Sequence, residues 1–220
     1  MRNAVIALLT AAVVTGIGVG TAAAQANVYI VHGIPGPAVD VYVDGELLRG
    51  GFEPTQIDGP IQLAAGEYQI DIFPAGEEPL AGSELVRASI ALSDGQAVAL
   101  VAHVLAEDEG GQDELAVSAF GVDLRPTLSG AARLGVRHAA VAPPVDLVAA
   151  STALLKNGQF TLNVTQRAGA ATDAPAGPYT AFLAATGGTE RLFPVDGNLS
   201  LSLQPGIAYY VYATGKFPDS

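Results

Sequence analysis

The stretch His32-Gly-Ile-Pro-Gly-Pro-Ala-Val-Asp40 decides the fold of this chain, because His138-Ala-Ala-Val-Ala-Pro-Pro-Val-Asp146 repeats its pattern. The spacing from His to Pro to Asp is the same in both stretches. The repeat indicates that the 220 residues consist of a leader and two copies of one domain. A residue type that recurs in both copies is explained by a shared fold as readily as by a shared reaction.

A second motif extends the repeat, since Ala65-Gly-Glu-Tyr68 corresponds to Ala176-Gly-Pro-Tyr179. Insertions and deletions lie between the motifs, where loops tolerate them. We therefore predict a first repeat at residues 27–120, a linker at 121–130 and a second repeat at 131–220.

Short stretches of alternating β-branched and aromatic residues, separated by Gly, Pro and Asp, predict β-strands throughout both repeats. Val39–Val43 alternates in this way, and Asp44-Gly45 supplies the chemistry of a hairpin turn. Further strands are expected at residues 68–73, 88–92, 97–104 and 114–120. Many short strands with regular turns predict an all-β protein of two tandem antiparallel immunoglobulin-like β-sandwich domains.

The two repeats differ at their ends. The first closes with an additional candidate strand, Glu114–Phe120, whereas the second stops after Tyr209–Ala213. Three explanations are open: the second sandwich has one strand fewer, it uses the linker as its edge, or it has an open edge. An open edge would allow self-association or strand addition by another chain.

The N-terminus has the features of a cleaved signal peptide, assigned to residues 1–26. Arg2 precedes the uncharged apolar run Ala4–Gly20, and small residues then permit cleavage after Ala24 or Ala26. The alternative, an uncleaved membrane anchor, is disfavoured because roughly 17 apolar residues are at the short limit for spanning a bilayer. We therefore expect a secreted, extracytoplasmic protein.

Composition limits the partners. The chain has 22 acidic and 10 basic residues, a net charge of −12 and no cysteine. This charge repels nucleic acid and anionic membrane surfaces, so we expect neither as a partner and no stable membrane insertion after leader removal. The expected partner is an extracellular or cell-envelope macromolecule of unknown identity.

The two opening stretches, with Ala65-Gly-Glu-Tyr68 and the strand ending at Pro74-Ala-Gly76, resemble an exported bacterial family known as domain of unknown function 4397. The resemblance covers nearly all of the mature chain and implies an extracytoplasmic β-sandwich, often in tandem copies. It implies no activity and no functional residues. The second repeat departs from the pattern, because Ala149-Ala-Ser151 stands where the first has its Asp-Gly turn.

The His and Asp of each opening stretch could form a polar dyad or half of a metal site. One such His in each domain is too few for a closed zinc site, which needs four ligands. We therefore interpret the imidazole as ending the first strand with a hydrogen bond to a loop carbonyl or to the Asp, and the Asp as fixing a turn through backbone N–H groups. The residues of this structural motif are His32, Pro37, Asp40, His138, Pro143 and Asp146.

Two other groups are candidate binding residues. An acidic loop offers oxygen ligands for a weak Ca²⁺ site, although it lacks dedicated calcium-loop spacing. The favoured interpretation is a solvated hairpin tip, since runs of like charge usually face water. Its carboxylates are Glu107, Asp108, Glu109, Asp113 and Glu114. In the last strand, Tyr209, Tyr210 and Tyr212 could offer a stacking surface for a sugar or peptide. The favoured interpretation is that their rings cover the sheet edge or the domain junction.

The sequence contains no nucleophile motif and no phosphate-binding glycine loop. We therefore expect no enzyme and no cofactor, but a secreted, non-enzymatic module that binds or scaffolds other macromolecules. The alternative is a small-ligand or glycan binder with a cleft between the domains. A less favoured possibility is a hydrolase built on loop carboxylates.

Overall fold

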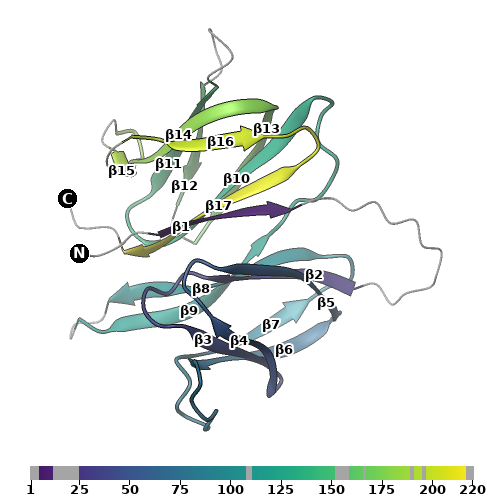
Figure 1. The fold of residues 1–220 in the computed structure, drawn as a ribbon, viewed down its shortest axis with the longest axis vertical. Helices are drawn as coiled ribbons and strands as arrows, with labels where there is room; N and C mark the ends of the chain where they lie inside the picture. Colours follow the sequence, from purple (N-terminus) through teal and green to yellow (C-terminus); the bar gives the residue numbers. More distant parts are fainter. Residues whose placement is uncertain are drawn as a thin grey trace, which may run out of the picture. The chain divides into compact units, whose positions relative to one another are not determined.

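The computed structural model describes residues 5–11, 25–107, 111–151, 159–165, 167–188, 191–194 and 197–216. It divides into two compact units: the first unit, Gly16–Val122, and the second unit, which joins Asp123–Ser220 with Met1–Thr15. Every regular element in these ranges is a β-strand, so the protein is all-β (Figure 1). The described residues therefore contain no helix of the length and hydropathy that crossing a membrane requires.

The first unit is a sandwich of two four-stranded sheets, one in the order β5-β2-β8-β9 and the other in the order β4-β3-β6-β7. Its strands are β2 (Gln25–His32), β3 (Val39–Val43), β4 (Glu46–Phe52), β5 (Ile57–Ala64), β6 (Gly66–Pro74), β7 (Val86–Leu92), β8 (Ala97–Glu107) and β9 (Asp113–Gly121). The strands expected from the sequence are all present.

The second unit has the same plan. One sheet has the order β1-β17-β10-β13, and the other has the order β12-β11-β14-β15, with β16 also paired to β14. Its strands are β1 (Val5–Ala11), β10 (Ala131–Val141), β11 (Val145–Ser151), β12 (Gln159–Val164), β13 (Gly169–Pro175), β14 (Gly177–Ala185), β15 (Arg191–Phe193), β16 (Leu199–Leu203) and β17 (Ala208–Lys216).

Each sandwich departs from a purely antiparallel arrangement at one pair of strands. β2 runs parallel to β8, and β10 runs parallel to β17, while the remaining pairs among the described strands are antiparallel. Residues 93–95 connect β7 to β8 without closing a hairpin, since β7 pairs with β6 and β8 pairs with β2 and β9. This turn carries the chain from one sheet to the other.

The predicted hairpin between β3 and β4 is confirmed. Val43 pairs with Glu46, and the two residues between them, Asp44 and Gly45, have φ angles of 50° and 82°. Two consecutive positive φ angles are characteristic of the type I′ turn, whose twist matches that of the flanking strands.

The core of each unit lies between its two sheets. In β11 the alternate residues Val145, Leu147 and Ala149 are buried in the core of the second unit, as a half-buried strand requires. Burying one large aliphatic side chain contributes about 1.5–3 kcal/mol.

Both units also contain the tyrosine hydrogen bond that is typical of immunoglobulin-like sandwiches. The Tyr68 hydroxyl donates to the Ala64 carbonyl at 2.9 Å, and the Tyr179 hydroxyl donates to the Pro175 carbonyl at 2.9 Å. The Ala-Gly-x-Tyr motif thus fixes the corner that leads into β6 and β14.

Candidate functional site

The two motif histidines are buried and occupy equivalent structural positions. In the second unit, His138 Nδ1 accepts a hydrogen bond from the Ala140 amide at 3.4 Å, and Nε2 lies 2.9 Å from the Pro143 carbonyl oxygen. This geometry assigns the proton to Nε2, which donates to that carbonyl. Burial lowers the pKa of His138, and the Pro143 carbonyl opposes this effect. His138 is therefore a neutral structural residue at neutral pH.

His32 repeats this arrangement with one difference. Its Nδ1 accepts from the Ile34 amide at 3.3 Å, and burial lowers its pKa, while the Pro37 carbonyl and Glu53 raise it. Within the described residues, however, Nε2 completes no hydrogen bond. His32 is the last residue of β2, as expected for an imidazole that ends the first strand.

The corresponding expectation for His138 is wrong, because β10 continues beyond it to Val141. The reason is that β17 is long enough to pair with Ala139, Ala140 and Val141.

Each motif aspartate accepts a hydrogen bond from the turn that follows a strand paired with its own, β6 for Asp40 and β14 for Asp146. Asp40 Oδ1 accepts from the Gly51 amide at 2.7 Å, and its Oδ2 accepts from the Gly76 amide at 3.0 Å. Asp146 repeats the second contact, since its Oδ2 accepts from the Gly187 amide at 3.0 Å.

The other oxygen of Asp146 accepts from the Asn163 side-chain amide at 2.9 Å. In the described contacts, His138 therefore bonds to a proline carbonyl, and each Asp accepts from at least one glycine amide, while neither His contacts its Asp. This arrangement supports the structural interpretation of the motif.

The three tyrosines of β17 are buried and form no exposed aromatic pair. Tyr209 belongs to the core, and its hydroxyl accepts from the Gln204 amide at 3.0 Å. The Tyr210 hydroxyl accepts from the Asp123 amide at 2.7 Å. Tyr212 is fully buried. Tyr209 faces the core, but Tyr210 and Tyr212 are buried as well, so the exposed stacking surface is not formed.

Tyr210 also packs between a glycine and an arginine. The Arg137 guanidinium carbon lies 4.6 Å from the centre of its ring, a distance at which a cation–π contact is favourable. A Cβ on Gly135 would lie 2.5 Å from Tyr210 Cδ1. Gly135 is therefore required for the close approach of the ring to β10.

The acidic loop is only partly described. Asp108 and Glu109 lie outside the described residues, as does the side chain of Glu107. Asp113 and Glu114 are exposed at the start of β9, and Asp113 pairs with Glu107 across the β8–β9 hairpin. Within the described ranges, no three potential ligands converge on a metal-sized site.

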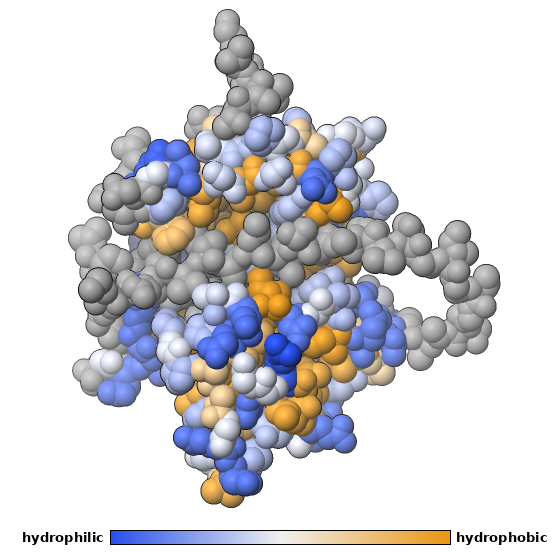
Figure 2. Space-filling model, in the orientation of Figure 1, coloured by the Kyte–Doolittle hydropathy of each residue, from blue (hydrophilic) through white to orange (hydrophobic). Residues whose placement is uncertain are grey.

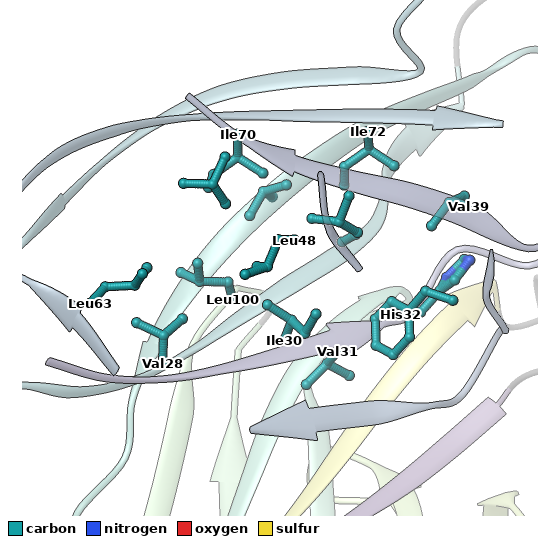
Figure 3. Close-up of a pocket in the computed structure, with 15 residues that line it drawn as sticks. Val28, Ile30, Val31, His32, Val39, Leu48, Leu63, Ile70, Ile72 and Leu100 are labelled. Carbon is teal, nitrogen blue, oxygen red and sulfur yellow. The ribbon is translucent and has the colours of Figure 1, made fainter. Parts of the chain in front are cut away.

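The first unit encloses a small apolar cavity between its sheets, of about 30 Å³. Figure 3 shows aliphatic side chains from both sheets around it, with His32 at one end. Its lining is almost entirely apolar, and an apolar lining keeps a small cavity dry. Most of the side chains that line the cavity belong to the core of the first unit.

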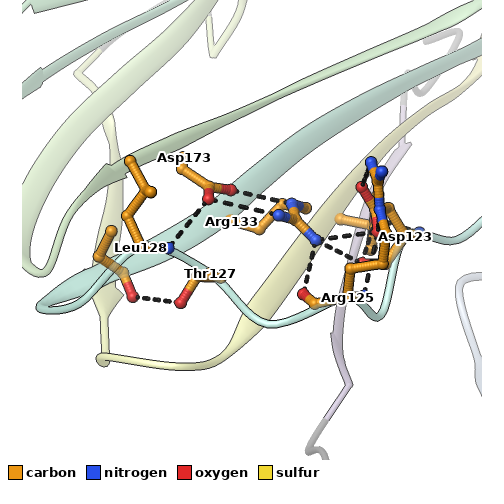
Figure 4. A network of polar contacts seen from close by, with 8 residues as sticks. Asp123, Arg125, Thr127, Leu128, Arg133 and Asp173 are labelled. Atoms are coloured by element: carbon orange, nitrogen blue, oxygen red, sulfur yellow. Dashed lines mark hydrogen bonds and ion pairs between the residues drawn. The ribbon is translucent and has the colours of Figure 1, made fainter.

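Residues of the expected linker form a polar network with the second sandwich (Figure 4). Arg133 in β10 contacts Asp173 at 2.9 Å and Asp123 at 3.0 Å. The Arg125 guanidinium and amide, together with Arg133, lower the pKa of Asp123 to about 2. No local sequence pattern indicates this network, because its partners are separated by up to 50 residues along the chain.

A few large hydrophobic side chains are exposed in the part of the chain that the structure describes. Figure 2 shows hydrophobic residues in small groups among hydrophilic ones on the visible face of the first unit. The large hydrophobic side chains with the highest exposure are spread along the sequence: Leu47, Leu80, Leu85 and Leu128.

The feature that best qualifies as a functional site is the outer edge of β17. In the first unit, β9 lies beside β8 at the end of its sheet. In the second unit, β1 fills this place, antiparallel to β17, with Val5 opposite Thr214 and Ala11 opposite Ala208 (Figure 1). Of the three explanations for the unequal repeats, the linker edge is wrong, because residues 122–130 contain no strand.

Residues 5–11 belong to the leader predicted from the sequence, so their place in the sheet was not expected. One sequence feature could have indicated a partner for β17, namely the missing last strand of the second repeat. It indicated that an edge needed a partner, but the partner lies about 200 residues away in the chain.

Three comparisons relate the chain to known proteins. The family model "Domain of unknown function (DUF4397)" matches residues 26–148. No curated protein matches the sequence. Among solved structures, a chain described as "The Bacillus anthracis TIE protein" is similar with a TM-score of 0.30 and 10% sequence identity. The match covers 88% of this chain and 51% of that one, so this chain spans about half the length of its structural neighbour. Because the family model matches more than half of the 220 residues, the chain belongs to the DUF4397 family.

Proposed function

We propose that this protein is exported, released from its leader and active outside the cytoplasm as a non-enzymatic module that binds or scaffolds other macromolecules. In this proposal the family's domain occurs twice, as the first and the second unit. The net charge of −12 supports solubility outside the cell and disfavours nucleic acid as a partner.

The packing of β2 supports one of the two cleavage positions. β2 begins at Gln25, where Gln25 pairs with Ala64 and Ala26 with Leu63. Ala26 is fully buried in the core of the first unit. Cleavage after Ala26 would remove this core residue, whereas cleavage after Ala24 leaves β2 complete. We therefore assign the cleavage to the bond between Ala24 and Gln25.

The pairing of β1 with β17 is the observation that carries the proposal. β1 lies within the segment assigned to the leader, so its removal takes away the neighbour of β17. An edge strand without a neighbour presents a row of unpaired N–H and C=O groups, which another strand can satisfy. Export would thus convert a closed sheet edge into a binding edge.

Expression of the full chain in a bacterium with a Sec export system tests the proposal. We expect intact-mass analysis of the extracytoplasmic fraction to find a soluble protein that begins at Gln25. Immobilised processed chain should then retain envelope macromolecules that the full chain does not retain, in Ca²⁺ and in chelator alike. Full-length protein held in the membrane, or equal retention by both forms, would contradict the proposal.

A further inference from the structure

In both units, the strand at this edge position runs antiparallel to its neighbour. β9 runs antiparallel to β8, and β1 runs antiparallel to β17 in the equivalent place. In the first unit the strand arrives through a hairpin from β8 itself. In the second unit it comes from the other end of the described chain, so the acceptor strand and the strand that it accepts are separate in sequence.

The backbone groups of β17 that face this position follow from the pairing with β10. The Arg133 amide donates to the Ile207 carbonyl at 2.9 Å. Because the backbone groups of successive residues in a strand point to opposite sides, those of Tyr209 and Val211 also face β10. Those of Tyr210 and Tyr212 therefore face β1.

The register determines which residues of a bound strand direct their N–H groups at β17 and which direct them away. Leu9 lies opposite Tyr210, and Leu8 lies opposite Val211. Leu9 is thus in a hydrogen-bonded pair, with its N–H directed at β17, whereas the N–H of Leu8 is directed away.

The side chains of β17 define the chemistry of the strand that fits. Residues opposite one another in a sheet share a face, and Tyr209, Val211 and Ala213 belong to the core of the second unit. A bound strand therefore places every second residue beside apolar side chains, where a charge would be costly. The seven residues of β1, Val-Ile-Ala-Leu-Leu-Thr-Ala, are all uncharged.

The geometry points to the outer edge of β17 as an acceptor site for an extended, uncharged, apolar peptide segment of about seven residues that binds antiparallel by strand addition. In the unprocessed chain, Val5–Ala11 occupies the site and keeps it closed to other segments. This inference rests on the proposed function, because leader removal in the cell is what would open the site to a partner.

The test uses the full chain with a specific protease site placed between residues 12 and 24. The protein folds with its own β1, and the protease then cuts the connection to β2. The probe is a fluorescent synthetic peptide with the sequence of Val5–Ala11, flanked by lysines for solubility. Fluorescence anisotropy follows its binding to the uncut chain and to the cut chain freed of its leader fragment.

Two proline peptides provide a matched control. Leu9→Pro removes the N–H that faces β17, whereas Leu8→Pro removes one that faces away. Both substitutions change the conformational preferences of the peptide in similar ways. We expect the probe to bind the freed chain and not the uncut chain. Leu9→Pro should weaken binding about tenfold or more, and clearly more than Leu8→Pro, because it leaves a β17 carbonyl without a partner.

Failure to bind the probe, or equal weakening by the two prolines, would overturn the inference. A stable dimer of the freed chain that excludes the probe would also overturn it, because the edge would then serve self-association. These outcomes are independent of the export experiment. A leader that is never removed in cells would defeat the proposed function, while probe binding to the freed chain would still establish the acceptor site.

Discussion

Replacing the first motif aspartate, Asp40→Ala, should strongly destabilise the first unit. The side chain of Asp40 is largely buried, and its two oxygens accept from the Gly51 amide at 2.7 Å and the Gly76 amide at 3.0 Å. A hydrogen bond to a charged group contributes about 1.5–3 kcal/mol, and its loss leaves a donor unsatisfied. Because the two contacts share one carboxylate, we expect a combined loss of about 3–5 kcal/mol in the free energy of unfolding.

The second repeat supplies an internal comparison. Asp146 accepts one backbone amide, from Gly187, and its other partner is the exposed side chain of Asn163, which water can satisfy. Asp146→Ala should therefore cost the second unit only about 1–2 kcal/mol. Asp94→Ala, which removes an exposed carboxylate, controls for the change in net charge.

Urea unfolding measures these losses of free energy. Hydrogen exchange, followed separately in each unit, shows which unit loses stability. The reasoning predicts a large loss of protection confined to the first unit for Asp40→Ala, a smaller one in the second unit for Asp146→Ala and almost none for Asp94→Ala. A free energy for Asp40→Ala within about 0.5 kcal/mol of the unsubstituted protein, the usual range for surface changes, would refute the structural role of the motif.

Three further predictions concern the second unit, and thermal or chemical unfolding measures each of them. Tyr179→Phe removes the hydrogen bond to Pro175 and should cost about 1 kcal/mol. Gly135→Ala brings a Cβ within 2.5 Å of Tyr210, and such overpacking should cost about 1–3 kcal/mol. Since the pKa of Asp123 is lowered from 3.8 to about 2, its contribution to stability is present above pH 4 and is lost as the pH falls towards 2. This contribution should be about 1 kcal/mol after solvent screening, and it should disappear in Asp123→Asn.

Each of these changes has a control or an outcome that would contradict it. Tyr68→Phe should cost no more than Tyr179→Phe, because the Tyr68 hydroxyl is more exposed. Gly121→Ala, where a Cβ meets nothing within 4 Å, should leave the free energy of unfolding almost unchanged. Equal losses of stability for Gly121→Ala and Gly135→Ala would argue against the packing of Tyr210. A pH profile unchanged by Asp123→Asn would show that the network does not stabilise the fold.

Local features of the fold could be predicted because their causes are local. Asp44-Gly45 specifies its own turn conformation, and the alternation in Val39–Val43 specifies a half-buried strand. The interpretation of Asp40 and Asp146 as turn-fixing residues also agrees with the contacts observed. The family, too, was identified from these motifs and is confirmed by the family model.

Features that depend on distant strand pairing could not be predicted in this way. Alternation in β17 indicates two faces, but only the sheet shows that Tyr209, Tyr210 and Tyr212 are all covered. The parallel pairing of β10 with β17 and the addition of β1 join segments far apart in the chain. No local pattern encodes their register.

Hydrogen exchange along β17 tests the central claim, the strand-accepting edge, most directly. On release of the Val5–Ala11 segment, the amides of Tyr210 and Tyr212 should exchange about tenfold faster or more, because they lose their partner strand. The amides of Tyr209 and Val211 should stay protected by β10, and added peptide should restore protection at the first pair. Unchanged exchange at Tyr210 and Tyr212, or an equal increase at all four amides, would contradict the account.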